Sequence, residues 1–117
     1  MSSSLLKPFD ILELSKKLVV ACYSLTSSLP PEEITNLTLY IRNGALTVHI
    51  NSVQATFAKK KKARKKFIKV SKNSLVIIDA SIEALLEVGL VKEEATTEVM
   101  QLSSVCYQQL DRLKRYK

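Results

Sequence analysis

Residues 60–88 carry the pattern that most constrains how this chain can fold. Side chains suited to a core recur there every three or four positions over about five turns, which places them on one face of an α-helix. On the same helical wheel, a set of lysines falls within an arc of about 160° on the opposite side. The core positions are Ile68, Ser71, Leu75, Ile78, Ile82 and Leu85 or Leu86, and the lysines are Lys59, Lys61, Lys62, Lys65, Lys66, Lys69 and Lys72. The pattern predicts a long helix with one face in a core and the other in solvent.

Helical spacing also marks both ends of the chain. A first helix is expected from about Ile11 until Pro30, with apolar residues Ile11, Leu14, Leu18, Cys22 and Leu25. A last helix is expected from Glu93, with apolar residues Ala95, Val99, Leu102, Cys106, Leu110 and Leu113. Because the chain has only two glycines, it is poor in residues for the tight turns of an all-β fold. We predict an all-α fold, an antiparallel up-down-up-down four-helix bundle over residues 10–117, after a frayed tail at residues 1–9.

The segment at residues 37–50 fits two structures equally well. It reads LTLYIR-NG-ALTVHI, and an Asn-Gly pair between two alternating apolar runs is a strong signal for a β-hairpin. A lone hairpin is marginally stable, however, and Gly44 inside a helix costs about 1 kcal/mol relative to alanine. As a helix, the segment has two apolar stripes on nearly opposite sides and needs a second partner besides the bundle. One stripe is Ile34, Leu37, Ile41, Ala45, Val48 and Ala55, and the other is Leu39, Leu46, Ile50, Val53 and Phe57.

Positive charge is concentrated in the run KKKKARKKFIKVSK. The run holds nine of the eighteen Lys and Arg residues and no acid, in a chain of formal charge +7. A solvated helix face is one interpretation, but such faces usually mix signs, and neighbouring bases repel one another unless an anion is near. We predict a salt-sensitive surface for nucleic-acid phosphates. Base stacking is not expected, because Phe67 is the only aromatic residue in the run and suits the core. The predicted binding residues are Lys59, Lys60, Lys61, Lys62, Arg64, Lys65, Lys66, Lys69 and Lys72.

No pattern of catalytic or metal-binding residues accompanies this surface. Cys22 and Cys106 are far apart, and the chain has a single histidine, so a zinc site is not expected and both thiols are predicted to be free and buried. His49 is predicted to be a half-buried structural residue, without a carboxylate or nucleophile beside it. The acids Asp79, Glu83 and Glu87 are expected to lie on the solvated face of the third helix. We predict no enzyme activity, no metal and no cofactor.

Membrane association is not expected either. The N-terminus lacks the basic and apolar regions of a signal peptide. The longest stretch without charge, residues 43–58, is rich in polar residues and is unsuited to a bilayer. The chain is therefore expected to be a soluble, cytoplasmic protein.

Three motifs, in this order and spacing, resemble a known family. IRNGAL at residues 41–46, AKKKKARKKF at residues 58–67 and EVGLVKEE at residues 87–94 are similar to the accessory variability determinant (Avd) proteins of diversity-generating retroelements. These belong to a wider four-helix-bundle family that includes proteins encoded in intervening sequences of bacterial 23S rRNA. The resemblance implies a four-helix bundle, which favours the helix over the hairpin. It also implies a homopentamer that binds RNA or DNA and acts with a reverse transcriptase during mutagenic retrohoming.

Departures from each branch of the family limit the resemblance. The serine-isoleucine-proline-alanine-asparagine stretch of the intervening-sequence branch corresponds here to residues 47–51, of which only Asn51 matches well. Many Avd proteins end in a tryptophan-bearing tail, and this chain has no tryptophan.

A homo-oligomer supplies the second partner that the two-sided helix needs. The predicted interface consists of Leu39, Arg42, Leu46, Ile50, Val53 and Phe57, with Arg42 either paired with an acid of a second copy or unpartnered. The alternative to the Avd-like function is an interaction module of the intervening-sequence type, whose basic face binds an acidic protein or ribosomal RNA.

Overall fold

The computed structural model describes residues 10–116. Within that range the chain forms four α-helices and one short 3-10 helix, and no strand: α1 (Asp10–Thr26), η2 (Pro31–Thr35), α2 (Leu37–Phe57), α3 (Lys61–Glu87) and α4 (Glu93–Arg115). The prediction of an all-α chain is confirmed, while the predicted tail at residues 1–9 lies outside the described residues.

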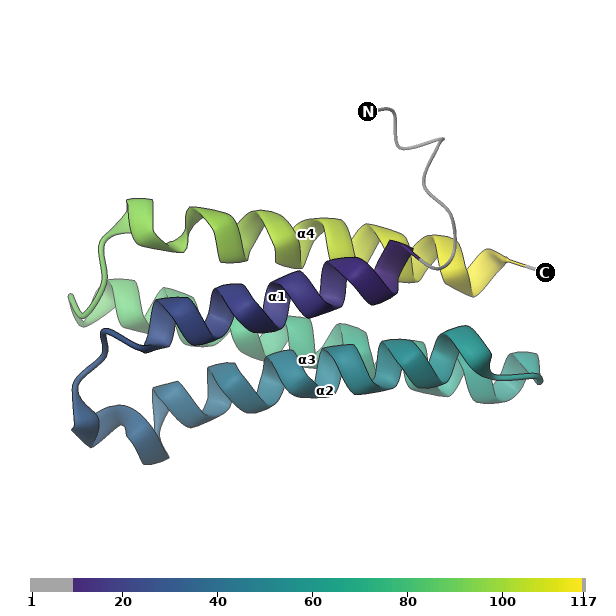
Figure 1. Ribbon diagram of the computed structural model, residues 1–117, viewed down its shortest axis with the longest axis horizontal. Coiled ribbons are helices and arrows are strands. Elements are labelled where there is room, and N and C mark those ends of the chain that lie inside the picture. Colours follow the sequence, from purple (N-terminus) through teal and green to yellow (C-terminus); the bar gives the residue numbers. More distant parts are fainter. Residues whose placement is uncertain (1–9, 117) are drawn as a thin grey trace.

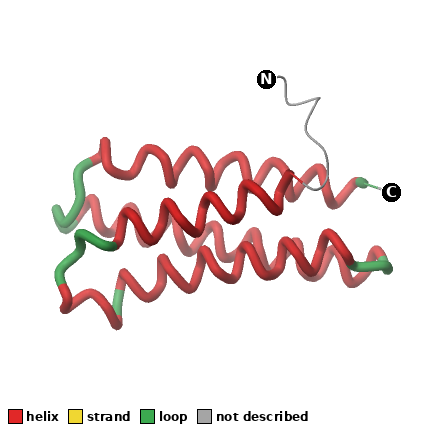
Figure 2. Tube along the Cα trace, in the orientation of Figure 1, coloured by secondary structure: helices red, strands yellow, loops and turns green. Residues whose placement is uncertain are grey.

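The four α-helices lie side by side, with connections at alternating ends of the molecule (Figure 1). Helix α1 packs against α2 and α4, and α3 packs against the same two helices. Figure 2 shows that only short loops separate the helices. The arrangement is compatible with the predicted up-down-up-down bundle. No helix of residues 10–116 combines the length and apolar content needed to cross a membrane.

Local signals account for where the helices begin and end. Pro31 starts η2, where a proline loses no helical hydrogen bond. Gly89 follows α3 with a φ of +78°, the left-handed conformation that glycine adopts without strain. The Leu90 N–H then donates to the Leu85 carbonyl, which satisfies one end of α3. Helix α4 opens with acids in its first turn and closes with basic residues in its last, matching the helix dipole.

The contested segment is helical, so the hairpin alternative is wrong. Helix α2 runs through the Asn-Gly pair, and Gly44 is buried where α2 crosses α3. A Cβ atom built on Gly44 would lie 2.8 Å from Ile78 Cγ1 and 3.6 Å from the Ser74 carbonyl oxygen. Ser71 also donates a hydrogen bond of 3.3 Å to the Val48 carbonyl across this crossing. Gly44 therefore allows the two helices to approach closely, and it does not form a turn.

Most residues predicted to face the core do so. Most of the predicted apolar residues of α1, α2 and α3 are buried in the core, and Leu14, Leu37 and Leu86 are partly buried at its edge. The buried residues are Ile11, Leu18, Cys22, Leu25, Ile41, Ala45, Val48, Ala55, Ile68, Leu75, Ile78, Ile82 and Leu85. Phe67 packs partly buried against this core, as predicted.

Two core predictions are wrong. Ile34 is exposed because it belongs to η2, and the chain changes direction at Asn36 before α2 begins. Ala95 is exposed because the buried stripe of α4 starts one residue later, at Thr96. Thr96 tolerates burial because its hydroxyl donates to the Glu93 carbonyl at 2.8 Å.

We predict that Gly44→Ala destabilises the protein, although alanine is the better helix former. The added methyl group must displace the fully buried Ile78, and overpacking of this kind costs about 1–3 kcal/mol against a gain in helix propensity of about 1 kcal/mol. Urea unfolding measures the difference. Asn43→Ala, at the exposed neighbouring position, is the matched control and should leave stability unchanged or slightly higher. A Gly44→Ala protein more stable than the wild type would contradict the close crossing.

Candidate nucleic-acid interface

Seven lysines of the predicted site are exposed, and together we name them the basic face: Lys59, Lys60, Lys61, Lys62, Lys65, Lys66 and Lys69. Lys59 and Lys60 precede α3, which begins at Lys61, one residue after the predicted start. The other five lie on the side of α3 that points away from its buried residues. Within residues 10–116, none of these seven lysines forms an ion pair with a carboxylate.

The two remaining residues of the predicted site have partners within the chain. Lys72 is half-buried and forms an ion pair with Asp111 of α4, and its Nζ lies 4.8 Å from the centre of the Tyr107 ring. Arg64 is also half-buried and donates a hydrogen bond to the Tyr116 carbonyl. These contacts hold the C-terminal half of α4 against the first half of α3. Both residues therefore contribute to packing between the helices as well as to the positive charge.

Helix α4 adds residues that the sequence did not suggest. A groove of about 300 Å³ between α3 and α4, here called the basic groove, is lined by Lys65, Ile68, Lys69, Lys72, Asn73, Tyr107 and Lys114. Lys114 and Tyr107 are seven residues apart, so they lie on the same face of α4. The sequence therefore shows that these two residues share a face of α4, but only the structure shows that this face meets α3.

We predicted that all three acids of α3, Asp79, Glu83 and Glu87, are solvated, and this prediction is wrong for Asp79. Glu83 and Glu87 are exposed, but Asp79 is half-buried and accepts a hydrogen bond of 2.8 Å from the Ser103 hydroxyl of α4. Burial raises the pKa of the Asp79 carboxyl above its ordinary value, although the Ser103 hydrogen bond opposes the rise. The hydrogen bond with Ser103 places Asp79 on the side of α3 that meets α4.

A second exposed surface is the apolar stripe of α2, defined as Leu39, Leu46, Ile50, Val53 and Phe57. Ile50 is 55% exposed and Phe57 is 64% exposed, while Val53 is partly buried. Arg42 beside the stripe is not an unpartnered side chain, since its Nε donates to Thr26 Oγ1 at 2.8 Å. Its guanidinium carbon also lies 4.5 Å from the centre of the Tyr23 ring. The contacts of Arg42 therefore fasten α2 to α1.

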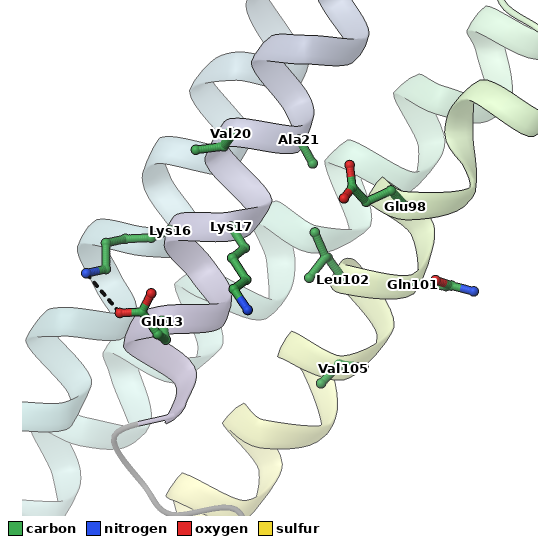
Figure 3. Close-up of a pocket in the computed structure, with 9 residues that line it drawn as sticks. All are labelled: Glu13, Lys16, Lys17, Val20, Ala21, Glu98, Gln101, Leu102 and Val105. Carbon is green, nitrogen blue, oxygen red and sulfur yellow. Dashed lines mark ion pairs between the residues drawn. The ribbon is translucent and has the colours of Figure 1, made fainter. Parts of the chain in front are cut away.

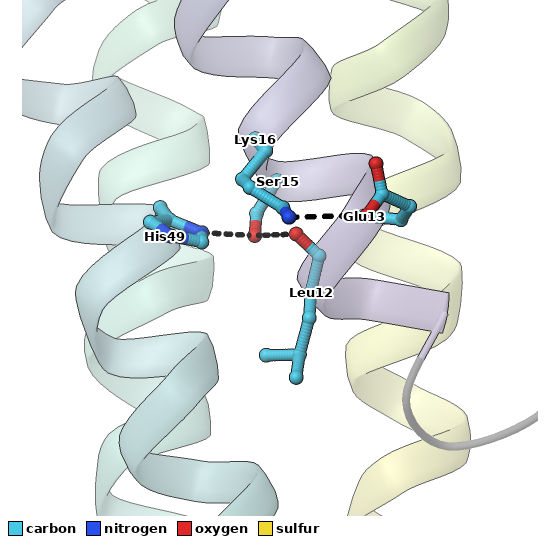
Figure 4. A network of polar contacts seen from close by, with 5 residues as sticks. All are labelled: Leu12, Glu13, Ser15, Lys16 and His49. Carbon is cyan, nitrogen blue, oxygen red and sulfur yellow. Dashed lines mark hydrogen bonds and ion pairs between the residues drawn. The ribbon is translucent and has the colours of Figure 1, made fainter.

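His49 was predicted to have no nucleophile beside it, but its ring lies next to the hydroxyl group of Ser15. Figure 4 shows its Nδ1 atom beside the Ser15 hydroxyl, at 2.7 Å, and Ser15 Oγ also lies 3.2 Å from the Leu12 carbonyl oxygen. Both contacts are satisfied when Ser15 donates to Leu12 and accepts from Nδ1–H. Ser15 is 0% exposed, so no substrate reaches its hydroxyl. The pair joins α1 to α2 and matches the structural role predicted for His49.

Another groove, of about 720 Å³, lies between α1 and α4. Figure 3 shows apolar side chains of both helices inside it, with Lys16, Lys17, Glu13 and Glu98 around it. Lys16 and Glu13 form an ion pair of 3.1 Å within α1. Because charges of both signs surround this groove, it lacks the concentrated positive charge of the basic face.

The two cysteines are free and buried, as predicted. Burial raises the pKa of each thiol to about 12, so both are protonated and unreactive at neutral pH. Among residues 10–116, no three His, Cys, Asp or Glu side chains gather closely enough to hold a metal ion.

No protein-family model matches the chain, and no curated protein matches it. The resemblance to the Avd proteins therefore stays a prediction based on the three sequence motifs.

We predict that the free energy of unfolding decreases as the pH falls from about 7.5 through 6.5, the ordinary pKa of histidine. Burial, and secondarily Lys16, lowers the pKa of His49 below its ordinary value of 6.5, so the unfolded chain binds a proton more readily than the folded chain. Stability is then lost as the pH falls through 6.5 towards the lowered pKa. Urea unfolding at several pH values measures this loss. His49 is the only histidine, so His49→Gln should flatten the dependence, and an equal slope in both proteins would refute the assignment.

Proposed function

We propose that this protein is a non-enzymatic, oligomeric accessory protein that binds nucleic acid through its basic face. The observation that carries the proposal is the exposure of seven lysines, five on the outer side of α3 and two directly before it, without a carboxylate paired to any of them in the described chain. Such a cluster is self-repulsive in isolation, and a polyanion removes the repulsion.

The expected chemistry is contact with phosphates. Each lysine is a point charge on a flexible stem, which suits phosphate oxygens but reads no base. Binding releases the counterions condensed on the nucleic acid, so affinity falls as salt rises. A single copy presents a modest surface. Several copies side by side would strengthen binding through effective concentration without any new contact.

The apolar stripe of α2 supports the oligomer. Its residues repeat at spacings of seven, four, three and four along the helix, which keeps them on one side of α2. A contiguous exposed stripe of large apolar side chains typically marks an interface. The motifs shared with the Avd proteins extend the proposal to an antiparallel bundle that assembles as a homopentamer and assists a reverse transcriptase in mutagenic retrohoming.

We predict that Lys65→Gln/Lys69→Gln weakens binding and reduces its salt dependence. Each phosphate that a lysine neutralises contributes about 0.9 to the slope of log K against log salt for duplex DNA. If both lysines bind phosphates, the slope should therefore shrink by about 1.8 in the double variant. Fluorescence anisotropy at several salt concentrations measures the slope.

The matched control removes the same charge elsewhere. Lys17→Gln/Lys92→Gln alters exposed lysines outside the basic face and should leave the slope unchanged. Equal decreases in both double variants, or wild-type binding that does not depend on salt, would overturn the proposal. Co-purification with a reverse transcriptase that persists after nuclease treatment would point to a direct protein contact.

We predict that Leu46→Lys/Ile50→Lys produces a folded monomer, because two charges placed on the apolar stripe cannot be desolvated in an interface. Light scattering coupled to size exclusion gives the solution mass. Val76→Lys, at an exposed apolar position of α3, is the control and should retain the mass of the wild type. A wild-type protein that is monomeric at all concentrations would refute the oligomer.

A further inference from the structure

Tyr107 lies at the boundary of two hollows between α3 and α4. On one side is the basic groove described above. On the other is a polar pocket of about 400 Å³, lined by Asp79, Met100, Ser103, Ser104, Tyr107 and Gln108. Tyr107 belongs to the lining of both hollows, so a ligand that occupies both lies against it.

The two hollows offer different chemistry. The basic groove brings together ammonium groups from two helices, and Lys65, Lys69 and Lys114 are exposed there. In the polar pocket, Ser103 is engaged with Asp79, whereas Ser104 and Gln108 are exposed and offer a hydroxyl and an amide. Met100 adds a polarisable apolar wall. A phosphate suits the first hollow, and a flat ring with polar edges suits the second.

Tyr107 itself is positioned for stacking. Tyr107 is 42% exposed, although the Lys72 ammonium lies 4.8 Å from the centre of its ring. Lys72 also forms an ion pair with Asp111, so its ammonium group is fixed beside the Tyr107 ring, where it makes a cation–π contact between α3 and α4. An exposed aromatic ring beside lysines is the arrangement with which proteins bind unpaired bases.

We propose that this side of the molecule binds single-stranded nucleic acid, with one base stacked on Tyr107 at the polar pocket and the adjacent phosphates in the basic groove. The inference rests on the proposed function and adds a preference to it. A duplex keeps its bases stacked inside, so it reaches the lysines but not the ring. The stacked base gives single strands an additional contact that a duplex cannot make.

Binding of matched single-stranded and duplex oligonucleotides to Tyr107→Leu and Tyr107→Phe tests the inference. One stacked base accounts for about fivefold to about 150-fold in affinity. Tyr107→Leu should weaken single-strand binding within that range and change duplex binding by less than about twofold. Tyr107→Phe keeps the ring and should bind as the wild type does. Parallel DNA and RNA single strands show whether the sugar matters.

A fluorescence variant gives a readout that does not depend on affinity. The chain has no tryptophan, so Tyr107→Trp introduces a single probe. A single-stranded oligonucleotide should quench its emission, and an abasic strand with the same phosphates should bind without quenching. Tyr40→Trp, at an exposed position of α2, is the control and should not be quenched.

The outcomes separate this inference from the proposed function. Salt-dependent binding that Tyr107→Leu weakens equally for single strands and duplex would overturn the stacking site alone. Unchanged affinity in Tyr107→Leu together with no quenching in Tyr107→Trp would do the same. Absence of salt-dependent binding to either form would overturn the proposed function as well.

Discussion

The close crossing of α2 and α3 is the constraint on which the rest of the structure depends. Gly44 lets the two backbones approach, and the small residues Ser71 and Ser74 occupy the α3 side of the contact. The hydrogen bond from Ser71 to the Val48 carbonyl links the helices within the buried interface. Once this side of α3 is fixed against α2, the opposite side faces solvent, and the lysines lie there. The same crossing turns the Gly44 side of α2 towards α3, and the apolar stripe of α2 stays exposed or partly buried.

The fold was largely predictable because apolar spacing sets which face of each helix is buried. The choice between helix and hairpin at residues 37–50 was not predictable, since Asn43 and Gly44 satisfy the requirements of a turn as well as those of a helix crossing. The difference depends on what contacts the glycine, and its contact with Ile78 comes from a helix more than thirty residues away. Ile34 and Ala95 were misplaced for a smaller reason. The chain changes direction at Asn36, which leaves Ile34 exposed, and the buried stripe of α4 starts one residue later than predicted, which leaves Ala95 exposed.

The candidate site was predictable as a run of charge but not as a surface. The sequence indicates the lysines of α3, but Lys72 and Asp111 are 39 residues apart, and their pairing depends on how α3 and α4 are rotated. The same rotation brings Tyr107 and Lys114 to the basic groove and turns Asp79 towards Ser103. The sequence therefore predicts only a positively charged surface, whereas in the folded chain an aromatic ring and a polar pocket lie beside it.

The central claim is that nucleic acid lies along the basic face and the basic groove. Acetylation of lysines followed by mass spectrometry, with and without a bound oligonucleotide, tests this most directly because it reports on each lysine separately. Bound nucleic acid should protect Lys65, Lys69 and Lys114, while Lys16 and Lys17 on α1 keep their reactivity. Uniform protection of all lysines, or protection confined to α1, would contradict the claim.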